Sequence, residues 1–295
     1  MDKEFHSGFV AIIGRPNVGK SSIMNRFVGE KVAIVSNKPQ TTRNKILGVV
    51  SHKDWQIVFV DTPGLHKPRN KLGEYMMKQA ADAREGVDAV LCVVDAQRIG
   101  PGDRAVMEDV AGMNCPRFLA VNKVDLARPE KLMPQLEGLS DLAFDQIVTV
   151  SALRGDNMDV LLKLLSQAMP VGPKYFPDDM MTDQPERLIC AEIIREKALL
   201  SLRDEIPHGI GVEMLAITKL SDNLTEIHAN IYCERQSHKS IIIGRQGSML
   251  RTIGQAARED IERMMGTKIS LKLWVKVRPD WRNRTGDLKA VGYEE

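Results

Sequence analysis

The sequence has few cysteines, no long apolar run and almost no net charge. None of its four cysteines stands in a C-x-x-C pair, which argues against a zinc site or a disulfide framework and is typical of a reducing cytoplasm. No apolar run approaches the ~18 residues that a membrane span requires, and the first residues lack a basic and apolar secretion signal. We therefore expect a protein that is neither secreted by that route nor membrane-spanning.

Apolar periodicity divides the chain into two predicted domains. Residues 9–168 alternate apolar strands with helical stretches, which predicts an α/β domain with a mostly parallel sheet and helices on both faces. The later pattern is helix, hairpin, helix, loop, helix and strand, and 295 residues are enough for two cores. The predicted division is a first domain at 1–169, a proline-rich linker at 170–185, a second domain at 186–280 and a polar, loosely held tail at 281–295.

A glycine loop lies between the first apolar strand and the first helical stretch. It reads G-x-x-x-x-G-K-S from Gly14 to Ser21. Strand, loop and helix in this order aim backbone N–H groups and a helix N-terminus at phosphate oxygens. Lys20 is expected to reach the outer phosphates, and the Ser21 hydroxyl is expected to ligate Mg²⁺. The predicted nucleotide contacts in this stretch are Gly14, Arg15, Pro16, Asn17, Val18, Gly19, Lys20, Ser21 and Ser22.

Two further segments complete the predicted phosphate and metal site. Asp61-Thr62-Pro63-Gly64 follows a strand, where the Asp61 carboxylate can hold Mg²⁺ and Gly64 lets the backbone approach the terminal phosphate. A polar stretch offers the hydroxyls of Thr41 and Thr42, one of which can close on Mg²⁺ when a γ-phosphate is present. We favour Thr42, although sequence alone does not separate the two. The predicted metal ligands are Ser21, Thr42 and Asp61, and the predicted catalytic residues are Lys20, Thr42, Asp61 and Gly64, with Thr62 and Pro63 as nucleotide contacts.

A base-recognition motif follows another buried strand. In Asn122-Lys123-Val124-Asp125, the Asp125 carboxylate can accept two parallel hydrogen bonds from guanine N1–H and the N2 amino group. Adenine lacks the N2 donor and would leave a buried oxygen unpaired, a loss that supports discrimination of ~10⁴-fold or more. Backbone N–H groups near Ser151 can reach guanine O6. The predicted base-binding residues are Asn122, Lys123, Asp125, Ser151, Ala152 and Leu153.

The second domain contains a G-x-x-G loop in a basic block. Residues 175–234 hold 5 Lys and Arg against 12 Asp and Glu, whereas residues 235–284 hold 12 against 4. A lone G-x-x-G usually marks only a helix entry, but the basic charge, the element order and the Lys-studded last strand favour a KH module for single-stranded RNA. The predicted RNA contacts are Ile243, Gly244, Arg245, Gln246, Gly247, Lys272 and Lys276.

The motif set GRPNVGKS, TTR, DTPG, NKVD and SAL resembles GTPases of the Era/TrmE/Der type. With KYFPDD at 174–179, RLICAEIIR at 187–195 and LWVKV at 273–277, the whole chain resembles the bacterial Era family. This resemblance implies a P-loop NTPase domain followed by an α+β type II KH domain. It also implies a GTP-hydrolysing switch that uses GTP or GDP and Mg²⁺ and binds small-subunit ribosomal RNA near its 3′ end during 30S subunit assembly.

The resemblance carries further expectations. Residue 65 is Leu, where many GTPases place a water-orienting glutamine, so hydrolysis is expected to be slow and to use a backbone-positioned water. His66 is a weaker candidate for a base, and Asn17 matches an asparagine that ligates K⁺ in some relatives. We expect a cytoplasmic monomer with at most peripheral contact with the inner face of the cell membrane.

Two alternatives are a GTPase of tRNA modification and a nucleotide-regulated interaction module. A tRNA-modifying relative would need a one-carbon-carrier domain and a C-terminal cysteine, and the sequence shows neither. An interaction module would tolerate loss of the G-x-x-G loop.

Overall fold

The computed structural model describes residues 4–36, 38, 41–64, 68, 70–139, 141–202 and 209–293. These residues form two compact units, which are described separately. The first unit contains the described residues of 1–35, 42–66 and 76–183, and the second contains those of 36–41, 67–75 and 184–295.

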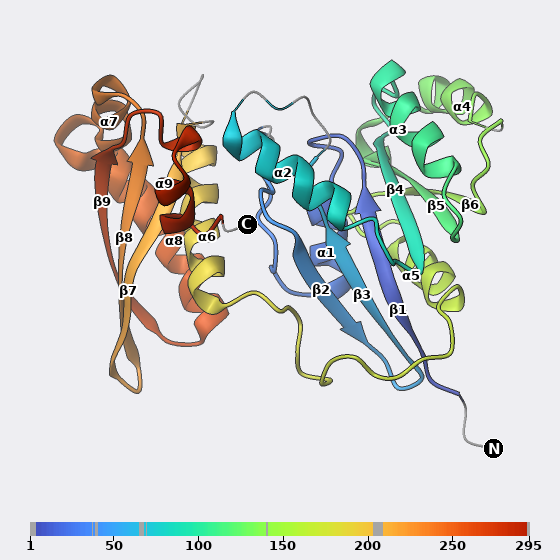
Figure 1. Cartoon of the computed structure of the whole chain (residues 1–295), viewed down its shortest axis with the longest axis horizontal. Coiled ribbons are helices and arrows are strands. Elements are labelled where there is room, and N and C mark those ends of the chain that lie inside the picture. The colour runs from blue at the N-terminus through green and yellow to red at the C-terminus, as the bar shows by residue number, and fades with distance from the viewer. Residues whose placement is uncertain are drawn as a thin grey trace. The chain divides into compact units, whose positions relative to one another are not determined.

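A six-stranded sheet forms the centre of the first unit (Figure 1). Its strands are β1 (His6–Ile13), β2 (Ile46–Ser51), β3 (Trp55–Asp61), β4 (Ala89–Asp95), β5 (Arg117–Asn122) and β6 (Gln146–Val150). The order across the sheet is β2-β3-β1-β4-β5-β6, and β2 runs antiparallel to β3 while the other neighbours are parallel. The predicted mostly parallel sheet is therefore confirmed.

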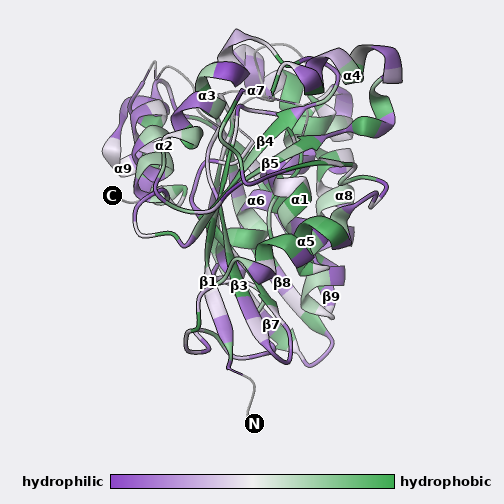
Figure 2. Cartoon of the chain, turned by 90° about the vertical axis from the view of Figure 1, so that its right-hand side faces the viewer, coloured by the Kyte–Doolittle hydropathy of each residue, from purple (hydrophilic) through white to green (hydrophobic). Residues whose placement is uncertain are grey.

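Apolar side chains on both faces of this sheet bind it to helices. Along β1, Val10 and Ile12 pack in one core while Ala11 and Ile13 pack in another, because successive side chains point to opposite faces. Figure 2 shows the resulting apolar strands between more polar outer surfaces. The helices of this unit are α1 (Lys20–Val28), α3 (Pro101–Ala111), α4 (Pro129–Glu137), α5 (Met158–Gln167) and residues 76–82 of α2 (Lys71–Asp82). Helices α1 and α5 contribute to the first core, and α3 and α4 contribute to the second.

The predicted linker is hydrogen-bonded to the first unit over much of its length. Gln56 of β3, which is fully buried, accepts the backbone N–H groups of Tyr175 and Phe176 and donates to the Phe176 carbonyl. The Tyr175 ring lies 5.0 Å from the Phe9 ring, and Thr182 donates to the carbonyl of Leu47 on β2. Residues 170–183 therefore belong to the first unit rather than forming a free tether.

The second unit contains a three-stranded sheet. Strands β7 (Gly211–Ser221) and β8 (Leu224–Cys233) form the predicted hairpin, and β9 (Lys268–Val277) pairs in parallel with β8. A parallel pair needs a crossover, and α7 (Gln236–Ile243) and α8 (Ser248–Met265) supply it. Helix α6 (Glu186–Ser201) packs with α8 and β7 around one apolar core. This arrangement confirms the predicted α+β module.

The C-terminal segment is ordered, so the expectation of a loosely held tail is wrong. Trp281 begins a short 3₁₀ helix (η4, Trp281–Asn283), is completely buried and donates its indole N–H to the carbonyl of Gly209 at 2.9 Å. Helix α9 (Thr285–Ala290) follows, and Leu288 and Tyr293 are also buried. This packing depends on a few large apolar side chains scattered in a polar segment. Because they follow no helical or strand periodicity, the sequence pattern did not predict it. Among the described residues, every helix is too short or too polar to span a bilayer.

Candidate functional site

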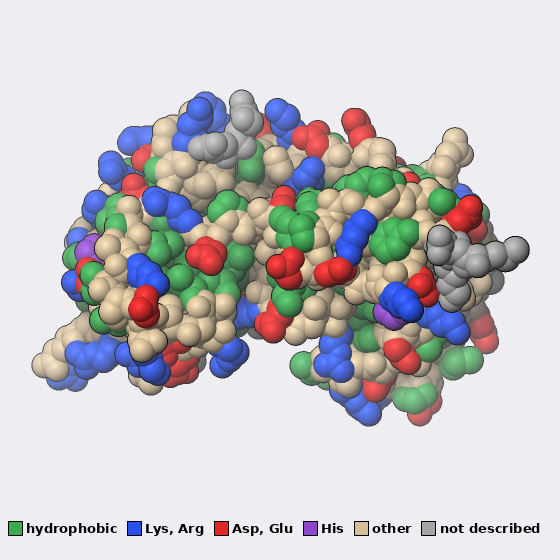
Figure 3. Space-filling model, turned by 90° about the horizontal axis from the view of Figure 1, so that it is seen from below, with side chains coloured by type: hydrophobic (Ala, Val, Ile, Leu, Met, Phe, Trp, Pro, Cys, Tyr) green, Lys and Arg blue, Asp and Glu red, His purple; other side chains and the backbone are tan. Residues whose placement is uncertain are grey.

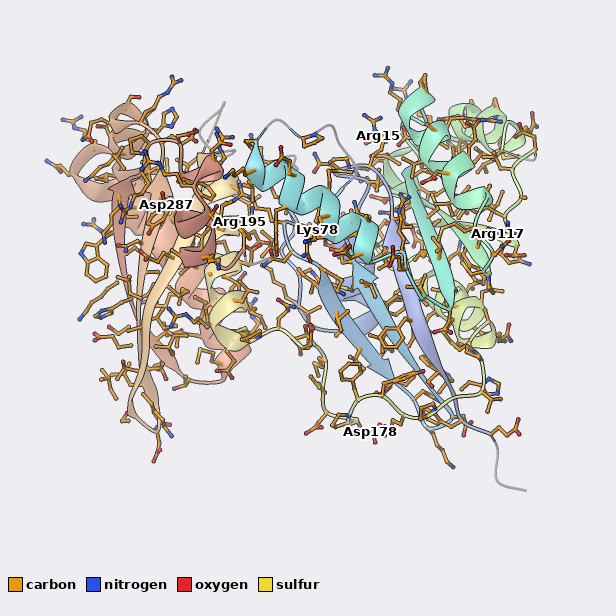
Figure 4. All side chains as sticks on the ribbon, viewed as in Figure 1. Arg15, Lys78, Arg117, Asp178, Arg195 and Asp287 are labelled. Carbon is orange, nitrogen blue, oxygen red and sulfur yellow. The ribbon has the colours of Figure 1, made fainter. Side chains whose placement is uncertain are left out.

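The glycine loop turns between β1 and α1 at the carboxyl edge of the sheet. Gly19 adopts φ +102°, and a Cβ there would lie 2.2 Å from the side-chain nitrogen of Asn122. Only glycine fits that position without displacing Asn122. Arg15 points away from the loop toward α3 (Figure 4), where its guanidinium lies 3.3 Å from the Asp103 carboxylate. The backbone of the loop, rather than the Arg15 side chain, therefore faces the predicted phosphate position.

Lys20 is buried at the start of α1, with its ammonium group folded back onto the glycine loop. Its Nζ donates to the carbonyl oxygens of Gly14 at 3.0 Å and Arg15 at 3.1 Å. Burial lowers the pKa of Lys20, and the nearby Asp61 carboxylate opposes that shift. A buried cation held by two neutral carbonyls is suited to an anionic ligand, because phosphate oxygens compensate its charge better than carbonyl dipoles do.

Three oxygen-bearing side chains converge beside Lys20. The Ser21 hydroxyl donates to Oδ2 of Asp61 at 2.5 Å, and the Thr42 hydroxyl lies 2.9 Å from Oγ of Ser21 and 3.3 Å from the same carboxylate oxygen. Burial raises the pKa of Asp61, and its Oδ1 accepts no hydrogen bond from the residues that the structure describes. A buried carboxylate with an unused oxygen beside two hydroxyls fits a hard cation such as Mg²⁺. The structure thus places Ser21, Thr42 and Asp61 together as predicted.

Thr41 lies differently from Thr42. Its hydroxyl donates to the carbonyl of Lys38 at 2.6 Å and so closes a local turn. The geometry therefore favours Thr42 over Thr41 as the metal-site hydroxyl.

Gly64 approaches the glycine loop closely. A Cβ on Gly64 would lie 2.6 Å from the backbone nitrogen of Pro16, so a side chain at this position would collide with the loop. Thr62 anchors the same segment by donating to the carbonyl of Ile12 at 3.1 Å. The Asp61–Gly64 turn thus brings backbone groups next to the predicted phosphate position. Leu65 and His66, which bear on the water-positioning prediction, lie outside the described residues.

Asn122 joins two loops of the predicted base site. Its Nδ2 donates to the carbonyl of Val18 at 2.9 Å, and its Oδ1 accepts the N–H of Ala152 at 3.0 Å. Both polar ends of this buried amide are therefore used within the protein. The prediction of Asn122 as a nucleotide contact stays a prediction, and its evident role in the structure is to position the two loops.

Lys123 and Asp125 border a pocket of about 750 Å³. Lys123 adopts φ +67°, and its Nζ reaches the carbonyl of Asn17 and the Asp95 carboxylate, each at 2.6 Å. Ser151 donates to Oδ1 of Asp125 at 2.6 Å, which orients that carboxylate. Other lining residues include Gly19, Ser22, Arg26, Val35, Ala152 and Leu153. The phosphate and base predictions thus meet in one continuous site, while Arg26 and Val35 were missed because they belong to no motif.

The G-x-x-G loop of the second unit connects α7 to α8 in an unusual backbone conformation. Gly244, Gln246 and Gly247 have φ values of +74°, +51° and +77°. A Cβ on Gly244 would lie 2.7 Å from Cβ of Met249, whereas one on Gly247 would meet no atom within 4 Å. Gly244 is thus required by packing, and the open space at Gly247 leaves the backbone accessible to a ligand.

A groove of about 550 Å³ lies between α8 and β9 and begins at Gly247. Leu250, Leu271 and Leu273 give it an apolar lining, and Arg251 and Arg258 add positive charge. Gly254 lies two turns after Gly247 on α8. A Cβ there would lie 3.5 Å from the Leu273 side chain, so the absence of a side chain keeps the groove open between α8 and β9. The sequence prediction missed both arginines. Their spacing of seven residues on the helix that follows the loop is the signal that identifies them.

The predicted RNA contacts are distributed over different surfaces. Ile243 packs against the apolar core. Lys272 does not line the groove but contacts Glu226 at 2.5 Å on the opposite face of the sheet. Leu271 and Leu273 of the same strand face the groove, so the alternation along β9 separates Lys272 from it. Lys272 and Lys276 thus stay predictions, away from the groove itself.

Comparison with known families defines the class of this protein. Residues 9–123 match the family described as 50S ribosome-binding GTPase, and residues 205–282 match the KH domain family. Together with the two sites above, these matches define a GTPase that carries a KH domain.

Full-length relatives give the particular family. GTPase Era of Alkaliphilus metalliredigens is 53% identical, covering 98% of this chain and 99% of that protein, and GTPase Era of Ruminiclostridium cellulolyticum is 51% identical, covering 98% of each. An Era crystal structure in complex with MgGDPNP and nucleotides 1506–1542 of 16S ribosomal RNA aligns at a TM-score of 0.93. It shares 38% identity and covers 99% of this chain and 100% of its own. A variant of Aquifex aeolicus Era bound to GDP and AlF4⁻ aligns equally well. The chain belongs to the GTPase Era family.

Proposed function

We propose that this protein hydrolyses GTP as a molecular switch and binds the 3′ end of small-subunit ribosomal RNA through its KH domain during 30S subunit assembly. The observation that carries the proposal is the arrangement at Gly247. An accessible left-handed loop opens directly into a groove with apolar walls and two arginines, in a chain that also holds a guanine-type nucleotide site. A KH groove of this kind holds about four unpaired nucleotides.

The residues of the first unit have different roles in the proposed hydrolysis: some neutralise phosphate charge, and others position the attacking water. Mg²⁺, held by the oxygens of Ser21, Thr42 and Asp61, would neutralise the phosphate charge that grows during hydrolysis. Lys20 adds a buried positive charge at the same place. Gly64 brings the backbone of the Asp61–Gly64 turn close to the glycine loop, where an N–H group can orient the attacking water. Without a glutamine at position 65, the intrinsic rate is slow.

We further propose that Asn17 contributes to a K⁺ site. Asn17 adopts φ +67° in the loop, and its carbonyl accepts Lys123 Nζ. A monovalent cation there would add positive charge near the predicted phosphate position, in a chain that has no glutamine at position 65 to orient the attacking water. Hydrolysis rates measured in K⁺ and Na⁺ buffers test this, and equal rates would contradict it.

The RNA-binding part is tested by one substitution and a matched control. Gly247→Asp places a carboxylate at the mouth of the groove and should weaken binding of an RNA with the 3′-terminal small-subunit sequence by at least tenfold, because phosphates and a carboxylate repel. Gly266→Asp is the control, since Gly266 ends α8 at φ +64° and also has no atom within 4 Å of an added Cβ. Gly244→Asp is unsuitable because its Cβ would collide with Met249. Equal RNA affinity of Gly247→Asp and the unsubstituted protein would rule out the KH assignment.

The switch part is tested by crosslinking to RNA with a GTP analogue and with GDP bound. Different RNA occupancy in the two states is expected, and identical occupancy would rule out a switch. We place the protein in the cytoplasm, where its proposed RNA partner is assembled into subunits, as a monomer with at most peripheral contact with the membrane.

A further inference from the structure

The two faces of the β7–β9 sheet differ in character. Leu273 and Val275 of β9 pack in the apolar core, so Lys272, Trp274 and Lys276 alternate onto the opposite face. In the register of the parallel pair, His228 of β8 lies opposite Lys272. We define the open face by Glu226, His228, Lys272, Trp274 and Lys276.

Trp274 is held in a fixed position on the open face although 44% of it is exposed. Its ring lies 5.3 Å from the His228 ring at an interplanar angle of 74°, an edge-to-face contact. Glu226 lies beside both His228 and Lys272. One of its carboxylate oxygens is 3.0 Å from Nε2 of His228, and the other is 2.5 Å from Nζ of Lys272. An exposed indole whose edge-to-face contact restricts its orientation can stack with a planar ligand.

The charge of this surface favours an anionic partner. Lys272 and Lys276 flank Trp274 on the same face of β9, and both are exposed. Two carboxylates lie on the same face: Glu226 pairs with Lys272, and Glu213 accepts a hydrogen bond from Asn230, which lies opposite Trp274. Arg278, over the Tyr232 ring, adds a third cation beside Lys276. In Figure 3, several Lys and Arg side chains lie on the second unit, at the left-hand end of the view. Single-stranded nucleic acid combines the two properties that the open face matches, planar bases and phosphate charge.

The open face and the groove share one strand. Ile269, Leu271 and Leu273 of β9 line the groove, while Lys272 and Trp274 lie on the other side of the same strand. Because β9 is the edge of the sheet, no further described strand separates the two surfaces. An RNA that leaves the groove can pass over this edge and reach Trp274.

We propose that Trp274 is a stacking platform for an unpaired base that lies outside the KH groove, with Lys272 and Lys276 contacting the adjacent phosphates. The proposal rests on the proposed RNA-binding function and extends its footprint. It predicts that the protein holds more nucleotides than a KH groove alone can.

Two RNAs from the 3′-terminal sequence test this with the full chain, one of about four nucleotides that fills the groove and one of about ten. Trp274→Ala should weaken binding of the longer RNA by roughly 5- to 150-fold, the range for losing one base–aromatic stack. Its affinity for the shorter RNA should be unchanged. Trp274→Phe should keep most of the affinity. Leu215→Ala, on β7 at the other edge of the sheet and 43% exposed, is the control and should bind both RNAs normally.

Tryptophan emission gives a second readout that needs no destabilising change. Of the other two tryptophans, Trp281 is buried and Trp55 lies on β3 of the first unit. Stacking on Trp274 should therefore quench emission in the unsubstituted protein when the longer RNA binds, and Trp274→Phe should remove that quenching. Unchanged affinity of Trp274→Ala for the longer RNA, with Gly247→Asp losing both RNAs, would overturn the platform and leave the KH assignment standing. Normal binding by Gly247→Asp would instead remove the KH assignment. A dimer that Trp274→Ala dissociates, with RNA affinity unchanged, would assign the open face to self-association and also overturn the proposal.

Discussion

The hydroxyl oxygens of Ser21 and Thr42 lie 2.9 Å apart and share one carboxylate oxygen of Asp61. Ser21 lies in the first turn of α1 and Thr42 lies between α1 and β2, and their contact brings the predicted metal ligands together. Thr42→Ala should therefore lower magnesium-dependent GTP hydrolysis roughly 10- to 100-fold, the effect typical of losing a group that organises a metal site. Thr41→Ala is the control, since its hydroxyl serves a local turn. A larger loss in Thr41→Ala than in Thr42→Ala, measured as phosphate release, would contradict the assignment.

Asp125 should decide which base the pocket accepts. Its carboxylate, oriented by Ser151, matches the two donors of guanine. Asp125→Asn replaces one acceptor oxygen by a donor, so the variant should bind guanine nucleotides up to ~10⁴-fold more weakly than the unsubstituted protein. Xanthine carries an oxygen in place of the guanine N2 amino group and should bind better than guanine. Competition between GTP and XTP for a fluorescent nucleotide measures this, and an unchanged preference for GTP would contradict the predicted role.

Gln56 should hold residues 175 and 176 on the first unit. Gln56→Leu keeps the volume but removes three hydrogen bonds to the linker and one to the Ser51 hydroxyl. It leaves two linker N–H groups without their acceptor, a cost of about 2–4 kcal/mol. The expected result is faster proteolytic cleavage after Lys174 and a lower unfolding temperature. Gln146→Leu, on the exposed end of the edge strand β6, is the control. Cleavage at equal rates in the two variants would show that the linker is held by other contacts.

The C-terminal segment should stabilise the KH unit. Trp281→Ala removes a completely buried indole and the hydrogen bond to Gly209, which typically costs about 3–5 kcal/mol. Truncation after Asp280 should destabilise the second unit at least as much. Truncation after Tyr293 keeps the buried side chains that the structure describes in this segment, and it should leave the unfolding temperature unchanged. Thermal unfolding of the three variants measures the difference. An unchanged unfolding temperature after truncation at Asp280 would show that the C-terminal segment does not stabilise the second unit.

The cysteines should differ in reactivity because burial changes their pKa values. Burial raises the pKa of Cys92 to about 12, so at pH 8 its reactive thiolate should be roughly a thousandfold rarer than that of a free thiol with a pKa near 8.5. Burial also raises the pKa of Cys115, but that side chain is partly exposed. Labelling by a disulfide reagent at pH 8 should therefore modify Cys115 first. Cys115→Ser should abolish the early phase, and rapid labelling of Cys92 in the folded protein would contradict its burial.

Much of the fold follows from local sequence patterns. Buried parallel strands read as apolar runs, and a glycine loop between a strand and a helix has few structural solutions, so the sequence predicted the mostly parallel sheet and the α+β module. The strand pairing β8–β9 was harder to foresee, because it is a parallel contact across the whole α7–α8 crossover. The hydrogen bonds of the predicted linker to the first unit were hard to foresee for the same reason, since Gln56 and Tyr175 are 119 residues apart.

By itself, the sequence determined the class of chemistry, a GTPase joined to a KH module. It also predicts a phosphate loop, a metal carboxylate, a guanine acceptor and a G-x-x-G loop, because each motif is formed by adjacent residues. Tertiary structure decided where chemically equal residues lie relative to each predicted site. It favoured Thr42 over Thr41 at the metal site, showed Asn122 joining two loops, and brought Arg251 and Arg258 to the groove while turning Lys272 to the open face. The physical reason is that side-chain type is local, whereas direction and burial depend on contacts between residues far apart in the chain.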